Sequence, residues 1–464
     1  MPPQWRIVAL EKEVLAVVLR ILSRILCVLL ASSVVLTGHA RAQDISILRD
    51  AEIENIIRTY ATPIFAVAGL DPAAVHVYVV NDPTLNSFVA GGQNLFVNSG
   101  TILRSETPNQ LVGIIAHETG HISGGHLART DEALRHATIQ NIIALVVGAA
   151  AAAASGNGGA GAAAILGGSS LAQRSFLQFS ITQEASADQA ALSFLDRTGQ
   201  SAKGLLQFFE ILQQQELLSA AHQDPYMRTH PLTSQRVTYV REHVLHSRFS
   251  DVRDPPDWIE MHRRMKAKLA AFLGSPPQVL AAIKPGDNSV AARYARAIAY
   301  YRVPDLKQAV PLIDGLIEDY PDNPYFQELK GQMLFENGRI AEAVPPYEQA
   351  VKLSPKSALL RIELAQVQLE TNDPVFVPKA LAHLNEAVRF EDRNPDAWRF
   401  LAIAYGRSDN MGMMALALAE EGIADGDYGQ ARQQASRAIK QLPAGPAKQR
   451  AQDIQDEAKR EGKP

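Results

Sequence analysis

The chain has 464 residues, of which 47% are hydrophobic and 20% charged, so its length and composition predict two or more folded domains with sizeable cores. Lysine and arginine number 45 and aspartate and glutamate 49, which gives a formal net charge of only −4. This balance argues against a nucleic-acid partner, and we predict none. The single cysteine, Cys27, excludes an intramolecular disulfide.

Residues 1–42 are predicted to be a cleavable signal peptide. Arg20 and Arg24 precede an apolar run over residues 25–36, and Ala40-Arg41-Ala42 matches the A-x-A cleavage pattern. The run is too short to span a bilayer comfortably. Cleavage after Ala42 would remove the only cysteine, which fits a protein exported to a bacterial periplasm. Two alternatives stay open: an uncleaved signal anchor, and a translation start downstream of Met1.

The segment after the signal peptide is predicted to form a helix and a small β-sheet. Apolar residues recur at spacings of three and four over residues 44–70, which predicts an amphipathic helix. The β-branched segment 75–80 predicts a strand, and the alternating segment 93–98 predicts a second one. Between them, residues 86–92 read as a turn-rich junction.

The segment 107–126, TPNQLVGIIAHETGHISGGH, predicts a helix that carries a metal site. Thr107 and the proline after it are typical of a helix start. On this helix His117 and His121 lie four residues apart, so both imidazoles can face one metal ion. Glu118 can then take a proton from an attacking water. Because HExxH also occurs by chance, the alternative is an amphipathic helix with two solvated histidines and a surface glutamate.

A catalytic zinc site needs a third protein ligand and an open position for water. The metzincin spacing would put a histidine at Leu127, and His126 misses that register by one residue, so we exclude this subclass. A second predicted helix, residues 176–196, carries Glu184 and Asp188 four residues apart on one face. We predict Glu184 as the third ligand and Asp188 as a hydrogen-bond partner of a ligating histidine. The alternative is two carboxylates on a solvent-facing stripe.

The motifs HETGH and EASAD, and then Thr229-His230-Pro231 followed by Arg236, resemble in this order the HtpX-like and CAAX-protease-like family of zinc metallopeptidases. The resemblance covers about residues 86–236 and implies a helical gluzincin-type fold with a small sheet. It implies one Zn²⁺ per chain, and it assigns the zinc ligands and the residues beside them. The implied ligands are His117, His121 and Glu184, with Glu118 as general base and Asp188 as supporting residue.

The resemblance also implies roles for His230, Arg236 and one strand. His230 would lie close to the metal, where it can occupy the fourth position and hold the enzyme shut. Arg236 would orient the substrate or the loop of His230. In the family, the strand that follows the glycines lies along the active-site cleft and pairs with extended substrate backbone. The implied substrate strand is Gly92, Gln93, Asn94, Leu95, Phe96 and Val97; the alternative is an interior strand of the sheet.

Residues 137–173 contain no charged side chain. Two apolar patches, 142–154 and 160–166, flank a glycine-rich stretch, and each is too short to span a bilayer. We expect an apolar hairpin or lid near the site that could make a peripheral membrane contact or meet an unfolded client. A flexible alanine–glycine insert is the alternative.

The C-terminal half is predicted to be an α-solenoid. Ala297, Gly331 and Ala365 repeat a small residue at intervals of 34, the tetratricopeptide period. We predict a protease domain over residues 43–250, a helical linker over 251–287, four or five repeats over 288–445 and a tail over 446–464. Stacked repeats bind a protein on their concave face. A generic all-helical domain is the alternative.

These features predict a mainly α (α+β) protein, in which a helical gluzincin-type metalloprotease domain precedes tetratricopeptide repeats. The resemblance implies a periplasmic endopeptidase that cleaves unfolded or stalled outer-membrane proteins, with the repeats docking clients or the β-barrel assembly machinery. Two other classes stay open. One is a chaperone or assembly adaptor with a latched zinc site, and the other is a structural zinc scaffold that would tolerate Glu118→Gln.

Overall fold

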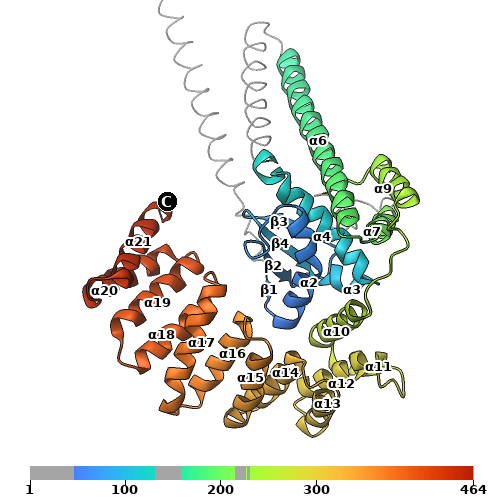
Figure 1. Ribbon diagram of the computed structural model, residues 1–464. Helices are drawn as coiled ribbons and strands as arrows, with labels where there is room; N and C mark the ends of the chain where they lie inside the picture. Colours follow the sequence, from blue (N-terminus) through green and yellow to red (C-terminus); the bar gives the residue numbers. More distant parts are fainter. Residues whose placement is uncertain (1–45, 131–157, 215–225, 227–229, 463–464) are drawn as a thin grey trace, which may run out of the picture. The chain divides into compact units, whose positions relative to one another are not determined.

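Figure 1 shows the computed structural model, which describes residues 46–130, 158–214, 226 and 230–462. The predicted fold class is confirmed, because within these residues helices dominate, a four-stranded sheet lies in the N-terminal half, and helix pairs make up the C-terminal half. The predicted signal peptide, Cys27 and the apolar patch 142–154 lie outside the described residues.

The sheet has the strand order β1-β2-β4-β3. β4 runs parallel to β2 and antiparallel to β3, and valine and leucine side chains of β2 and β4 are buried. The predicted junction 86–92 therefore contains a strand that sequence analysis missed. The chain turns after it at Gly91 and Gly92, whose φ angles of +56° and +95° favour glycine. The strands are β1 (Ile47–Leu48), β2 (His76–Val80), β3 (Ser87–Ala90) and β4 (Asn94–Asn98).

The predicted substrate strand is an interior strand, so its assigned role is wrong. β2 pairs along one edge of β4, and β3 pairs along the other. Asn94, Leu95, Phe96 and Val97 therefore have no free edge on which a substrate backbone could pair. Gly92 and Gln93 precede this strand, and the Gln93 carbonyl accepts a hydrogen bond from the His76 amide. The edge strands of the sheet are β1 and β3, and β3 is the one that pairs with β4.

Helix α4 lies at the centre of the N-terminal half and contacts α2, α6 and α7. Thr107 caps it by accepting a hydrogen bond from the Gln110 amide, and Gln110 accepts one from the Glu106 amide. Glycine allows close packing at Gly120, where a Cβ would lie 2.8 Å from the Ala187 carbonyl oxygen on α6. The helices are α2 (Ala51–Val67), α3 (Ser99–Arg104), α4 (Pro108–Ser123), α6 (Gly158–Arg197), α7 (Lys203–Gln213) and α9 (Ser234–His246).

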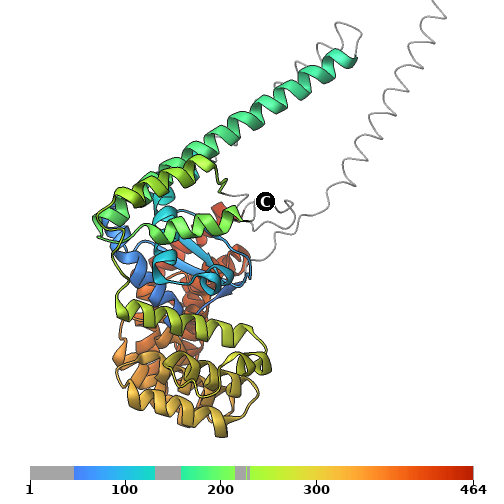
Figure 2. The same cartoon turned by 90° about the vertical axis from the view of Figure 1, so that its right-hand side faces the viewer.

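Helix α6 is longer than the predicted helix over residues 176–196, because it begins at Gly158. The apolar patch 160–166 is therefore part of this helix, and the rest of the expected hairpin or lid lies outside the described residues. Alanine, the strongest helix former, occupies residues 160 and 162–164 of this segment. Figures 1 and 2 both show the first half of α6 extending away from α4 and the sheet. Among the described residues, no helix has the length and hydropathy that a membrane span requires.

Helices α10 (Pro256–Leu273) and α11 (Pro276–Ala282) lead into five consecutive helix pairs over the fully described residues 290–461. The predicted tail is wrong, because residues 446–461 form α21, which closes the last pair. Ala451, Ile454 and Ala458 recur at helical spacing and are buried against α19 and α20. The paired helices are α12 (Val290–Arg302), α13 (Leu306–Asp319), α14 (Pro324–Glu336), α15 (Ile340–Leu353), α16 (Ala358–Glu370), α17 (Val377–Phe390), α18 (Pro395–Arg407), α19 (Met411–Ala424), α20 (Tyr428–Gln441) and α21 (Pro446–Glu461).

A buried ionic cluster connects α10 with both halves of the chain. Lys268 of α10 is 1% exposed, and its Nζ lies 2.8 Å from Asp50 Oδ2 and 3.3 Å from Glu328 Oε2. Asp50 caps α2, while Glu328 lies on α14 in the repeats. Beside them, buried Glu52 pairs with Arg264 at 2.7 Å. The cluster therefore holds the start of the N-terminal half against the linker helix and the repeats.

Candidate metal centre

Two histidines of α4 face each other across the position where a metal ion would be held. His117 and His121 are both buried, and their Nε2 atoms lie 3.1 Å apart. Two unprotonated ring nitrogens would repel each other at this distance, so either a proton or a cation must lie between them. Their spacing of four residues on one helix produces this convergence.

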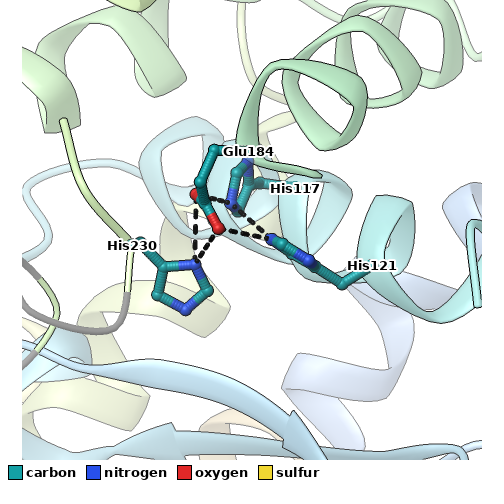
Figure 3. Close-up of side chains that lie close together, drawn as sticks. All are labelled: His117, His121, Glu184 and His230. Atoms are coloured by element: carbon teal, nitrogen blue, oxygen red, sulfur yellow. Dashed lines mark hydrogen bonds and ion pairs between the residues drawn. The ribbon is translucent and has the colours of Figure 1, made fainter. Parts of the chain in front are cut away.

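Glu184 of α6 brings a carboxylate to the same point. Its Oε2 lies 3.3 Å from His117 Nε2, and its Oε1 lies 3.3 Å from His121 Nε2. Ligand atoms of these three residues and of His230 all lie within 4.8 Å of one another (Figure 3). The structure therefore brings together the three residues predicted as ligands, although they come from two helices.

Asp188, one turn beyond Glu184 on α6, holds the outer nitrogen of the first histidine. His117 Nδ1 donates to Asp188 Oδ1 at 2.9 Å, which leaves Nε2 free for a metal. Arg236 then holds Asp188 with two donors, Nε at 2.6 Å and Nη2 at 2.9 Å. Its Nη1 also lies 2.9 Å from Glu184 Oε2. Arg236 thus fixes both carboxylates of the EASAD motif.

Glu118 is fully buried, and within the described part of the chain neither of its carboxylate oxygens takes part in a hydrogen bond. His230 lies beside it, with its Nε2 3.7 Å from Glu118 Oε1. Burial raises the pKa of Glu118 to about 6, against the opposing charge of His230. Burying a carboxylate without hydrogen bonds is costly, so stability alone does not explain this residue. A carboxylate in this state can accept a proton from a reacting water.

His230 enters the site from the segment that precedes α9. Its Nδ1 donates to Glu184 Oε1 at 3.1 Å, and its ring stacks on Tyr226 with centroids 4.4 Å apart. The imidazole therefore lies between Glu184 and Glu118, in the space that a water and a scissile carbonyl would need. Sequence analysis assigned no role to Tyr226. Its position four residues before His230 is the sequence feature that could have suggested this ring contact.

The electrostatics of the cluster favour a bound cation. Burial disfavours charge on His117, but hydrogen bonds with Asp188 and Glu184 outweigh it and raise its pKa to about 9. Burial likewise opposes charge on Glu184, yet the charge of His230 and the hydrogen bonds from the histidines hold its pKa well below the usual value. For His121, burial lowers the pKa to about 3. A divalent cation would supply the positive charge that His117 otherwise takes as a proton.

The donor set fits zinc better than the hard cations. Two imidazole nitrogens and one carboxylate are a known catalytic zinc set, while Mg²⁺ and Ca²⁺ prefer oxygen ligands. Beside this set lie His230 and the Glu118 carboxylate, which makes no hydrogen bond among the described residues. These two observations agree with a metal that keeps one position for water or for an exchangeable ligand.

His126 also lies against the metal centre, although sequence analysis only excluded it as a ligand. Its Nδ1 is 3.0 Å from Nδ1 of His121. The signal in the sequence was its place five residues after His121, directly behind two glycines.

Comparisons with known proteins agree with this geometry. Residues 48–244 match Peptidase family M48, and residues 286–358 match a tetratricopeptide repeat. The beta-barrel assembly-enhancing protease of Yersinia pestis is 23% identical over 362 residues, which cover 77% of this chain and 73% of that protein. The protein of the same name from Escherichia coli (strain K12) is 23% identical over 386 residues, 82% of this chain and 77% of that protein. Metalloprotease LoiP of the same strain is 29% identical over 180 residues, 37% of this chain and 63% of that protein.

Proposed function

Because residues 48–244 match Peptidase family M48 and residues 286–358 match a tetratricopeptide repeat, we propose that this chain is a zinc-dependent endopeptidase of the bacterial periplasm. The observation that carries the proposal is the buried carboxylate of Glu118, without a hydrogen bond among the described residues, beside the convergent ligand atoms of His117, His121 and Glu184. A purely structural metal site has no need for such a carboxylate.

His117, His121 and Glu184 would hold one Zn²⁺ per chain. When bound, zinc supplies Lewis-acid chemistry, which acidifies water and polarises a carbonyl. Glu118 takes the proton of the attacking water and later delivers it to the leaving amine. Its pKa of about 6 suits this exchange, because the group accepts a proton near neutral pH and can also release it.

His230 and Arg236 would control access to this chemistry. His230 donates to Glu184 and lies 3.7 Å from Glu118, so its ring must move before a substrate carbonyl can approach. Arg236 donates to the Pro231 carbonyl and pairs with Asp188, which ties the His230 segment to the supporting carboxylate. We therefore assign His230 as a latch and Arg236 as the residue that holds its loop.

Substrate would bind in an extended form on β3, the strand with a free edge beside α4. The Asn98 amide donates a hydrogen bond to the Asn86 carbonyl. Hydrogen-bonded and non-hydrogen-bonded residue pairs alternate along an antiparallel ladder, so the N–H and C=O groups of Val89 point away from β4. Strand addition uses main-chain hydrogen bonds and so tolerates many side chains. This suits a protease whose clients are defined by being unfolded.

The clients that we propose are unfolded or stalled outer-membrane proteins, with the repeats docking them or the β-barrel assembly machinery. The support comes from two relatives named as beta-barrel assembly-enhancing proteases, which this chain matches over most of its length, and from the protein-binding character of stacked repeats. The domain limits proposed are 43–250 for the protease and 251–287 for the linker, with the repeats extended to include α21.

A second candidate function is a chaperone or assembly adaptor whose zinc site stays closed. The observation that favours it is the His230 ring, which fills the space beside Glu118.

The two functions predict different outcomes when the protein is mixed with an unfolded outer-membrane protein. The mature chain, loaded with zinc, should cleave a urea-unfolded outer-membrane β-barrel protein but not the same protein folded in detergent, and a chelator should abolish cleavage until zinc is restored. Suppression of aggregation without any cleavage product would favour the adaptor.

A further inference from the structure

The residues directly after the HExxH helix place a third histidine, His126, against the metal centre. Gly124 is the C-cap of α4, and Gly125 has a φ of +63°, a conformation that favours glycine. After these two glycines a further helical stretch begins at His126. The His126 side chain is buried, with the residue only 3% exposed.

The contact between His126 and His121 is specific in geometry. The two Nδ1 atoms lie 3.0 Å apart, and the ring planes are nearly perpendicular at 81° with centroids 4.9 Å apart. Glycine at position 124 is required for it, because a Cβ there would lie 2.4 Å from His126 Nε2. Both glycines of the Ser-Gly-Gly-His sequence therefore serve to seat this imidazole.

If Nε2 of His121 binds a metal, the contact fits only one tautomer of each ring. Nε2 of His121 faces Glu184 and His117 Nε2, so it must offer a lone pair if it is to bind a metal. In neutral imidazole the proton then resides on Nδ1, which becomes a donor that needs an acceptor. Nδ1 of His126 is that acceptor when His126 carries its own proton on Nε2.

Each of the two ligating histidines therefore has its own partner at the outer nitrogen. His117 Nδ1 donates to the Asp188 carboxylate, whereas His121 Nδ1 meets an imidazole. A neutral acceptor adds no further negative charge to a site that already holds the carboxylates of Glu118, Glu184 and Asp188. Both partners restrict the ring rotation of the ligand that they contact.

We propose that His126 is a positioning residue, which fixes the tautomer and ring orientation of His121 for metal binding. This inference rests on the proposed function, because it assumes that His121 Nε2 binds zinc. His126 itself touches neither metal nor substrate. Its loss should act first on metal affinity and only through that on catalysis.

The test is the zinc affinity of the full mature chain, measured by competition with a chelating dye. His126→Leu keeps a similar volume but removes the acceptor, and we expect zinc to bind roughly 10–100-fold more weakly. His126→Asn can present its carbonyl oxygen to His121 Nδ1, and we expect its affinity to return to within a few-fold of wild type. His246→Leu is the matched control, because its side chain is 78% exposed on α9 and should change nothing.

Two results would overturn the proposal: wild-type affinity in His126→Leu, or equal weakening in His126→Leu and His126→Asn, which would show that only packing matters. If neither variant folds, the tautomers of the zinc-loaded wild-type chain decide, from ¹⁵N-histidine correlation spectra. The proposal requires a proton on Nδ1 of His121 and on Nε2 of His126, and the opposite tautomers contradict it. If the wild-type chain itself does not bind zinc, the proposed function fails before the role of His126 is reached.

Discussion

Replacing Lys268 with methionine removes a buried positive charge that three carboxylates share. Its Nζ lies 2.8 Å from Asp50, 3.3 Å from Glu328 and 3.6 Å from Glu52. Glu52 keeps Arg264 at 2.7 Å, and Asp50 is partly exposed and can be hydrated. Glu328 is buried, and Lys268 is its only ion-pair partner within the described residues. The loss therefore falls mainly on Glu328.

The magnitude follows from breaking a buried pair on one side, which costs about 3–5 kcal/mol. Burial already raises the pKa of Glu328 to about 7, so the carboxyl can partly escape the penalty by taking a proton. We therefore expect the lower end, a loss of about 3 kcal/mol in the free energy of unfolding. When folding raises the pKa of a carboxyl group, the folded protein becomes less stable as the pH rises from the unfolded pKa toward the folded pKa. Lys268 lowers the pKa of Glu328, so removing Lys268 extends this range to higher pH. The loss should consequently be larger at pH 8 than at pH 6.

The assay is urea unfolding of the zinc-loaded chain, followed by circular dichroism at both pH values. Lys203→Met is the matched control, because Lys203 pairs with Asp251 at 2.6 Å on the surface, with side chains 48% and 97% exposed. An exposed pair contributes little, so this variant should unfold like wild type. If Lys268→Met lost no more stability than Lys203→Met, the buried cluster would not hold the linker and the repeats to α2.

Three further predictions concern the metal centre. Asp188→Asn should weaken zinc binding about 10–100-fold in a chelator competition, and unchanged affinity would remove its supporting role. His230→Ala should raise basal cleavage at unchanged zinc content, whereas equal or lower cleavage by a folded variant would exclude the latch. Gly120→Ala should push α6 away from α4, cost about 1–3 kcal/mol and weaken zinc binding through Glu184. Gly113→Ala, crowded against α7 instead, should lower the melting temperature alone, and equal zinc affinities in the two glycine variants would contradict this explanation.

Local periodicity allowed much of this site to be predicted. His117 and His121 converge because residues four apart share a helix face, and the sequence states that spacing directly. Glu184 and Asp188 follow the same rule on α6. The structure brings these residues together as expected, with Arg236 and His230 beside them. The small residues at intervals of 34 likewise predicted the repeats, since each helix pair must pack closely on the next.

What sequence analysis missed depends on contacts between distant segments. Whether a strand is an edge or an interior strand is decided by its neighbours, so the sequence of β4 did not show that β3 would cover it. The short β3 was hidden because it is bounded by turn residues. His126 was missed because its role depends on the turn at Gly124 and Gly125, which brings its ring against His121. The segment predicted as a tail forms α21 because its apolar residues pack against the apolar surface of the preceding helices.

The central claim, that this site hydrolyses peptide bonds with Glu118 as base, is tested most directly by one comparison. Wild type and Glu118→Gln are each assayed for zinc stoichiometry and for degradation of an unfolded outer-membrane protein. The glutamine is close in shape and does not replace a ligand, so both proteins should bind one zinc ion per chain. Only the wild type should cleave. Equal cleavage by both proteins, or no cleavage by either, would contradict the claim that this site hydrolyses peptide bonds with Glu118 as base. The protein would then be better described as an assembly adaptor with a structural metal site and a repeat domain.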